Sequence, residues 1–359
     1  MAEKMSPAER MQAVMMGQKP DVVPVIPFEL GYAAQITGIS LGDFYADGDK
    51  CFEAQFYSML LHGFAQTPMY GYASCGPYEF GGEIGFPYGK GHSAPYVKRH
   101  PVMSLEDIDN LEVPTFDGPK LPGAYGEADK VAAHCAKMGM PVCFQIGSVF
   151  TAASVVAETS QFLKWVYKEP KAVNVLLDKV AEMFSNAVDY FVEKYGAEHL
   201  MPFDGGPVEA NTILSPKKFE EIVYPQMYKM HKKVIDAGVN VLLMHPCADQ
   251  NLNIPYYVRM REAMDWKCKY AWVFGPETTI TDQIAAFGDH DIICGNVDPP
   301  SLQNKSLEEI DQLCKENIEE GKNSPSGFIH MAGCEFPPLA SPHRMMAFVN
   351  AAEKYGRYD

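Results

Sequence analysis

Short apolar, β-branched runs alternate along the chain with longer amphipathic stretches, and a turn separates each run from the stretch that follows. Such runs are typical of buried strands. The expected strands are Val22–Pro27, Phe64–Tyr70, Pro141–Ile146, His199–Phe203, Val239–Met244, Trp266–Val273, Asp291–Gly295 and Gly327–Met331. Repeated alternation of strand and helix indicates a parallel sheet, and eight such units predict an α/β fold that closes into a (β/α)₈ TIM barrel.

Three of the amphipathic stretches are predicted as helices. Ser215–Ala237 begins with a serine followed by proline, which is a helix start signal, and its apolar residues recur at helical spacing. Leu307–Glu320 and Pro342–Tyr355 have the same pattern. We expect these helices to cover the outside of the barrel.

The segment Gly71–Leu121 departs from the alternation. It is rich in glycine, proline and aromatic residues and has little helical periodicity. We interpret it as a long insertion after the second strand, and because the loops after barrel strands build the active-site face, as a lid or pocket wall. The residues before the first strand form an N-terminal extension. We expect one domain over residues 1–359.

Composition narrows the classes of function. The chain has 359 residues, of which 47% are hydrophobic, and a formal charge of −16, which disfavours binding to nucleic acid or to an anionic membrane. The sequence has no apolar run long enough to span a membrane and no signal-peptide pattern at Met1–Pro7, so we expect a cytoplasmic protein. Nine cysteines in such a protein are not expected to form a disulfide framework.

The clearest chemical pattern joins a histidine and two cysteines. His245 and Cys247 follow an apolar run at a spacing of two, so both side chains point the same way, and Cys334 comes just after another predicted strand. Two thiolates and one imidazole are good ligands for Zn²⁺, and three protein ligands leave a position open for substrate. The remaining cysteines have no such neighbours and are expected to be core or surface residues: Cys51, Cys75, Cys135, Cys143, Cys268, Cys294 and Cys314.

Together with this pattern, several segments resemble corrinoid-dependent methyltransferases of the uroporphyrinogen decarboxylase superfamily. The resemblance covers nearly the whole chain and implies a TIM barrel, often dimeric, with zinc on His245, Cys247 and Cys334. It is carried further by Met5–Arg10, Gly17–Asp21, Asp204–Pro216, Gly295–Pro299 and Glu353–Gly356.

The sequence also departs from the superfamily's decarboxylases. Val22-Val23 stands where the family usually has an arginine before the proline, and the Arg-Gln-Ala-Gly-Arg-Tyr signature is absent. A porphyrinogen with many carboxylates needs guanidinium partners, so this loss disfavours decarboxylation. The loop Phe203–Asn211 is instead similar to that of O-demethylase methyltransferases. This similarity implies transfer of methyl from an aryl methyl ether to the cobalamin of a partner corrinoid protein.

Four more residues are candidates for the site. The resemblance implies Glu277 as a fourth, labile zinc ligand, and Asp204 and Glu209 are candidates as ligands or as partners of substrate hydroxyl groups. Asn296 is a candidate for the substrate-binding site, where it would act as a hydrogen-bond partner behind the residues that contact the substrate, or it simply shapes the turn before Pro299-Pro300.

Three alternatives stay open at this point. A thiol methyltransferase, with methyl flowing from methylcobalamin to a thiol, would suit the same ligands, because two thiolates make zinc a softer Lewis acid. A tetrapyrrole decarboxylase would need no metal. A non-catalytic scaffold would bind zinc only structurally, with four protein ligands.

Overall fold

Seven short strands run parallel in one sheet, in the order β1-β9-β8-β7-β6-β5-β4. The computed structural model describes residues 4–89 and 91–358. The strands are β1 (Val25–Ile26), β4 (Gln145–Gly147), β5 (Phe203–Gly205), β6 (Val241–His245), β7 (Lys269–Val273), β8 (Ile292–Cys294) and β9 (Phe328–Met331). Each neighbouring pair is parallel, which confirms the predicted alternation of strand and helix.

The eighth position of the barrel lies between β1 and β4, where the second strand was predicted at Phe64–Tyr70. That prediction is wrong in detail, because only Met69 pairs with a neighbouring strand segment, at Cys143. On the side that faces β1, the side-chain amide of Gln66 takes the place of backbone hydrogen bonds between strands. It accepts from the backbone N–H of Glu29 and donates to its carbonyl, both at 3.1 Å. The barrel therefore closes through one bridge and one side chain.

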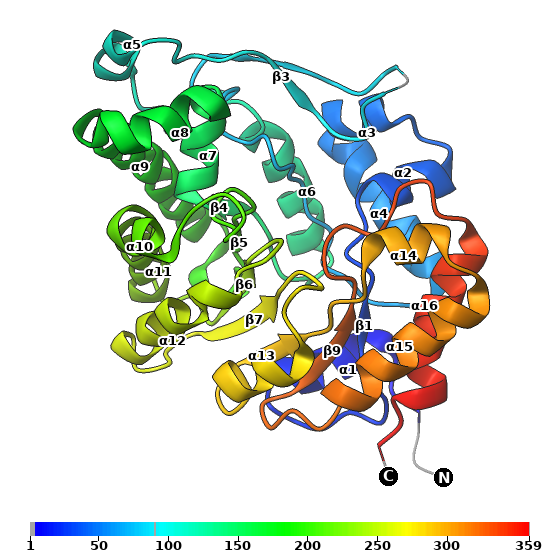
Figure 1. The fold of residues 1–359 in the computed structure, drawn as a ribbon. Coiled ribbons are helices and arrows are strands. Elements are labelled where there is room, and N and C mark those ends of the chain that lie inside the picture. The colour runs from blue at the N-terminus through cyan, green and yellow to red at the C-terminus, as the bar shows by residue number, and fades with distance from the viewer. Residues whose placement is uncertain (1–3, 90, 359) are drawn as a thin grey trace.

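Helices surround the sheet (Figure 1), and the fold is the predicted α/β barrel. Among the described residues, no helix is both long and apolar enough to cross a membrane. The helices are α1 (Pro7–Met15), α2 (Gly31–Thr37), α3 (Leu41–Ala46), α4 (Gly48–His62), α5 (Leu105–Asn110), α6 (Tyr125–Lys137), α7 (Val149–Val156), α8 (Thr159–Lys168), α9 (Pro170–Tyr195), η1 (Ala197–His199), α10 (Pro216–Lys218), η2 (Phe219–Val223), α11 (Tyr224–Asp236), η3 (Asn251–Asn253), α12 (Ile254–Ala263), α13 (Ile280–Phe287), α14 (Pro299–Asn304), α15 (Leu307–Gly321) and α16 (Pro342–Tyr355).

The three predicted helices are present, and one contains an irregular turn. Between α10 and α11 the segment η2 is a π-helix. It lies just before Pro225, which has no N–H and whose ring would collide with the carbonyl four residues earlier in a regular helix. A second local difference concerns β7, which begins at Lys269 and not at Trp266. Trp266 has a φ of 53° and lies in the turn after α12, where its backbone N–H donates to the carbonyl of Arg261 and its ring stacks on His290.

The insertion forms an antiparallel hairpin of β2 (Glu83–Gly85) and β3 (Tyr96–Arg99). Figure 1 shows it crossing the end of the barrel toward which the strands point. One end is fixed beside α7, where Val102 pairs with Ala157. The other end rests on α3, where the Tyr88 ring leaves no room for a side chain at Gly42. The hairpin thus forms a wall above the C-terminal ends of the strands.

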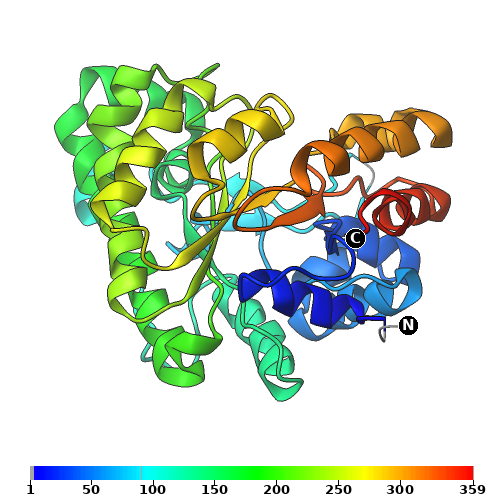
Figure 2. The same cartoon turned by 90° about the horizontal axis from the view of Figure 1, so that it is seen from below.

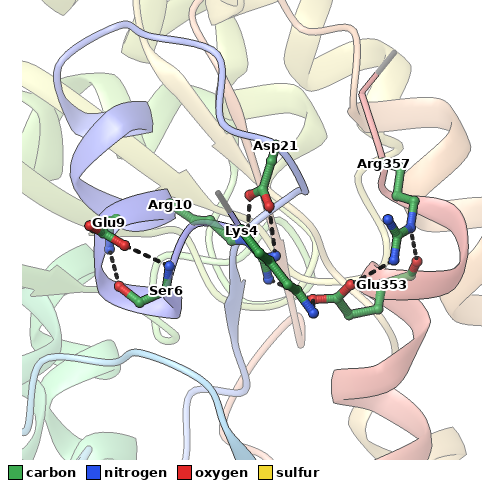
Figure 3. Close-up of polar contacts among 7 residues, drawn as sticks. All are labelled: Lys4, Ser6, Glu9, Arg10, Asp21, Glu353 and Arg357. Atoms are coloured by element: carbon green, nitrogen blue, oxygen red, sulfur yellow. Dashed lines mark hydrogen bonds and ion pairs between the residues drawn. The ribbon is translucent and has the colours of Figure 1, made fainter. Parts of the chain in front are cut away.

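Both chain termini lie at the opposite end of the barrel (Figures 1 and 2), where they are held together by charges. Arg10 of α1 donates to both carboxylate oxygens of Asp21, at 2.6 and 3.0 Å, and to Glu353 of α16 at 2.8 Å (Figure 3). Lys4 and Arg357 also contact Glu353. The first helix is therefore tied to the last at this end of the barrel.

A fully buried ion pair fixes α12 against β7 and β8. Arg261 donates from Nε and Nη2 to the two carboxylate oxygens of Asp291, both at 2.9 Å. Asp291 also accepts from the backbone N–H of Tyr270 and from the indole N–H of Trp272. Each charge is matched by a partner of suitable geometry, which is the condition for keeping an ion pair in the core.

Candidate metal centre

The predicted histidine and both cysteines meet at the C-terminal end of the barrel. His245 is the last residue of β6, Cys247 follows two residues later, and Cys334 lies three residues after β9. One ligand atom from each lies within 4.8 Å of the other two, and the two sulfurs are 3.9 Å apart. Tetrahedral zinc with Zn–S bonds of about 2.3 Å places two thiolates about 3.8 Å apart. The spacing of the two sulfurs therefore fits a zinc ion, and the histidine nitrogen lies near enough to complete the set.

The imidazole of His245 is oriented for this task. Its Nδ1 donates to the carbonyl of Val273 at 2.6 Å, because a carbonyl can only accept. Its Nε2 is buried and has no hydrogen-bond partner in the protein. A metal-ligating histidine usually anchors one ring nitrogen in this way and leaves the other for the ion. The rings of Phe28 and Phe203 lie beside it, with centroids 5.7 and 6.1 Å away.

The two thiols are electrostatically unequal. A hydrogen bond from Cys247 lowers the pKa of Cys334, burial opposes that shift, and His245 adds to it. The hydrogen bond with Cys334 raises the pKa of Cys247, and burial raises it further. Without a cation the pair therefore keeps one proton between two sulfurs. A dication supplies the charge that would let both become thiolates.

Glu277, the predicted fourth ligand, lies on the exposed loop after β7. Its carboxylate lies close to Gly275, and so does the backbone of Ala248, the residue after Cys247. Within the described part of the chain, the cluster of mutually close ligand atoms contains His245 and the two cysteines without Glu277. Its role as a ligand stays a prediction.

Asp204 and Glu209 lie together beside the ligand-bearing segment, both buried. They line a chamber of about 10 Å³, the space of a single water, which is also lined by Pro246, between the two β6 ligands. Asp204 accepts from Nε2 of His231 at 2.8 Å, and its other oxygen has no partner. The candidate substrate roles of the two acids stay predictions.

The environment of Glu209 strongly raises the pKa of its carboxyl group. It accepts from the hydroxyls of Ser148 and Thr151. Burial raises the pKa of Glu209 to about 7, the Thr151 hydroxyl opposes the shift, and the charge of Asp204 adds to it. The acid is therefore partly protonated near neutral pH.

This shift predicts a pH dependence of stability. Because the pKa of Glu209 is higher in the folded protein than in the unfolded chain, its stabilising contribution is complete below about pH 4.5 and is lost as pH rises through about 7. We expect the urea midpoint of Glu209→Gln, relative to wild type, to rise between pH 5 and pH 8. Parallel midpoint curves for the two proteins across this range would contradict the assignment, and Glu198→Gln at an exposed glutamate is the control.

Asn296 acts on the loop that carries Glu277. Its amide donates to the carbonyls of Gly275 and Thr278, at 3.0 and 2.5 Å, and accepts from Asn317 at 3.4 Å. Both of its donors are thus used by the protein backbone. These contacts fix the loop after β7, and a substrate-binding role for Asn296 stays a prediction.

Two functional-looking residues were not predicted from the sequence. His231 lies on the buried face of α11 among Met227, Met230 and Val234. A histidine within an apolar stripe is the signal that could have singled it out. Gln250, which contacts the Cys247 segment, follows the cysteine in a polar loop and carries no such signal.

The fold and the site together define a barrel protein with His245, Cys247 and Cys334 clustered at its C-terminal face. The profile of the uroporphyrinogen decarboxylase (URO-D) family matches residues 6–355. The chain therefore belongs to this family.

Relatives with known names carry two different activities. Uroporphyrinogen decarboxylases from Pseudoalteromonas translucida and Serratia proteamaculans are 25% and 27% identical over 271 residues, covering 71% and 72% of this chain and 70% and 71% of their own. A methyltransferase from Methanosarcina mazei superposes with a TM-score of 0.77 at 18% identity, over 98% of this chain and 99% of that one. At that identity the likeness establishes a shared fold.

Proposed function

We propose that this protein is a zinc-dependent methyltransferase that moves a methyl group from an aryl methyl ether to the cob(I)alamin of a partner corrinoid protein. The observation that carries the proposal is the cluster of His245, Cys247 and Cys334, with an unpartnered imidazole nitrogen aimed at two sulfurs. Three protein ligands leave a coordination position for substrate, as catalytic zinc sites do.

The chemistry that bound zinc supplies here is Lewis-acid stabilisation of the leaving oxygen. An aryl ether suits this site, because phenol has a pKa near 10 and its anion is a tractable leaving group. The protein's own part is positional. The carbonyl of Val273 fixes the ring of His245, and Cys247 and Cys334 are only half-buried.

Part of the insertion that carries the hairpin is placed to take part in substrate binding. Its position above the strand ends supports a role in shielding the reaction from water. Tyr72 and Phe80 of the insertion are buried and pack in the core, whereas Tyr78 and Tyr88 are exposed. The exposed rings and the half-buried rings of Phe86 and Tyr96 are available to a substrate.

Apolar side chains exposed on C-terminal loops support a protein partner. Ile213 follows β5, Leu252 follows β6 and Leu339 follows β9, with exposed fractions of 46%, 61% and 67%. A corrinoid protein must approach this face to deliver its cobalt.

The contacts of the arginines in this protein argue against a decarboxylase activity like that of the named relatives. The chain has six arginines, all described, and each already has acceptors within the protein. They pair as follows: Arg10 with Asp21 and Glu353, Arg99 with Glu83, Arg259 with Glu220, Arg261 with Asp291, Arg344 with the carbonyls of Leu302 and Lys305, and Arg357 with Glu353. No free guanidinium is left for a porphyrinogen carboxylate.

The test mixes zinc-loaded protein with cob(I)alamin and a panel of methoxylated phenols under anaerobic conditions. We expect the Co(I) absorbance to fall and methylcobalamin to appear, and chelator-treated protein to show neither change. A protein that holds zinc and changes no ether would contradict ether demethylation. Methylcobalamin with a small thiol forms the second arm, because the two-thiolate ligand set also suits thiol methylation.

A further inference from the structure

The buried side chain of Gln250 joins the loops after β5 and β6. Its Nε2 donates to the carbonyls of Cys247 and Gly206, both at 3.2 Å. Its Oε1 accepts from Nδ2 of Asn253 at 2.6 Å and from the hydroxyl of Tyr257 at 3.1 Å. Gln250 is 0% exposed. Both donors and both acceptor positions of the amide are therefore used, and its orientation is fixed.

The backbone that Gln250 holds needs support. Ala248, directly after the metal-ligating Cys247, has a φ of 60°, in the left-handed region that costs a non-glycine residue energy. The next carbonyl, of Asp249, accepts from the backbone N–H of Asn211 at 2.7 Å. The turn that aims Cys247 back at Cys334 is thus anchored on the β5 loop, and Gln250 supplies the bond at Cys247 itself.

A neutral amide suits this position for an electrostatic reason. Two carbonyl groups need donors, and two thiolates lie nearby when metal is bound. A carboxylate would repel both carbonyls and thiolates, whereas an amide donates twice and adds no charge.

We infer that Gln250 is a positioning residue that presets Cys247 relative to Cys334 and His245 and thereby sets the metal affinity of the site. The inference rests on the proposed function only for the identity of the metal. Loss of the Gln250 side chain removes the hydrogen bond to the Cys247 carbonyl and lets the turn at Ala248 relax. Part of the metal-binding free energy is then used to order Cys247, so metal affinity falls.

The experiment measures metal affinity directly, in full-length protein without substrate. Gln250→Met keeps the length of the side chain and removes its hydrogen bonds. We expect zinc affinity, measured by chelator competition, to fall by roughly 10- to 100-fold, the range seen when outer-sphere partners of ligands are lost. The absorption bands of the Co²⁺-substituted variant should shift, because the thiolate geometry changes. Tyr257→Phe, which removes one contact to Gln250, should show a smaller loss in the same direction.

Gln55→Met is the matched control. Gln55 is equally buried, and its amide bonds the backbone of Cys51 and Met69 on the other side of the barrel. It should lower the unfolding midpoint without changing zinc affinity. Equal affinities and Co²⁺ spectra for wild type and Gln250→Met would overturn the inference, as would an equal affinity loss in Gln55→Met. A wild type that binds zinc but demethylates no ether would overturn the proposed function alone, and one that binds neither Zn²⁺ nor Co²⁺ would overturn both.

Discussion

Replacement of Cys334 by alanine is expected to abolish metal retention during purification. Zinc binding of about 10–16 kcal/mol spread over four ligands amounts to roughly 3 kcal/mol for each, so loss of one thiolate should weaken affinity by at least about 100-fold. Cys334 is half-buried, so the smaller side chain should leave the fold intact. Zinc content by atomic emission and affinity by chelator competition give the result.

Cys268→Ala serves as the control for this loss. Cys268 is also half-buried, lies in the turn before β7, and has no histidine or second cysteine as a ligand partner. We expect it to keep one zinc per chain. A Cys334→Ala protein that still holds stoichiometric zinc would refute the assignment of the centre. A melting transition that moves when zinc is removed, with all four ligands coming from the protein, would favour a structural role instead.

Asp291→Asn is expected to give the largest loss of stability among single polar substitutions. The change leaves the guanidinium of Arg261 fully buried with no negative partner, and breaking a buried pair in this way costs about 3–5 kcal/mol. For a chain of this length we expect a fall in melting temperature on the order of 5 °C. Urea unfolding followed by circular dichroism measures the difference.

The same chemical change at an exposed pair gives the comparison. Asp236 contacts Lys232 one helical turn away, and its side chain is 60% exposed. Asp236→Asn should change the free energy of unfolding by no more than about 0.5 kcal/mol, because solvent screens such pairs. Similar effects at Asp236 and Asp291 would contradict the importance assigned to the buried network.

Parts of the fold and of the site that depend on local pattern could be predicted from the sequence. The helix at Pro342–Tyr355 was predicted to the residue, since its apolar spacing and its proline are local signals. The meeting of His245, Cys247 and Cys334 at one face was also predictable. The spacing of His245 and Cys247 fixes their common direction, and the barrel brings strand ends such as that before Cys334 to one face.

Other features failed because they depend on contacts that no local pattern records. Phe64–Tyr70 has the composition of a strand, yet the Gln66 side chain occupies the place of its ladder. Trp266 has high strand propensity, but it lies in the turn after α12, where its ring stacks on His290. In both cases a tertiary contact outweighs an intrinsic preference of well under 1 kcal/mol per residue.

By itself, the sequence determined the barrel, its repeating units and the three side chains that are candidates for metal ligands, because backbone geometry makes these follow from periodicity and spacing. Only the tertiary structure decided how those ligands are held. The carbonyl of Val273 anchors His245, and Gln250 anchors Cys247 through the carbonyls of two loops. Every residue has a carbonyl, so its use at one site is decided solely by which segments the folded chain brings together.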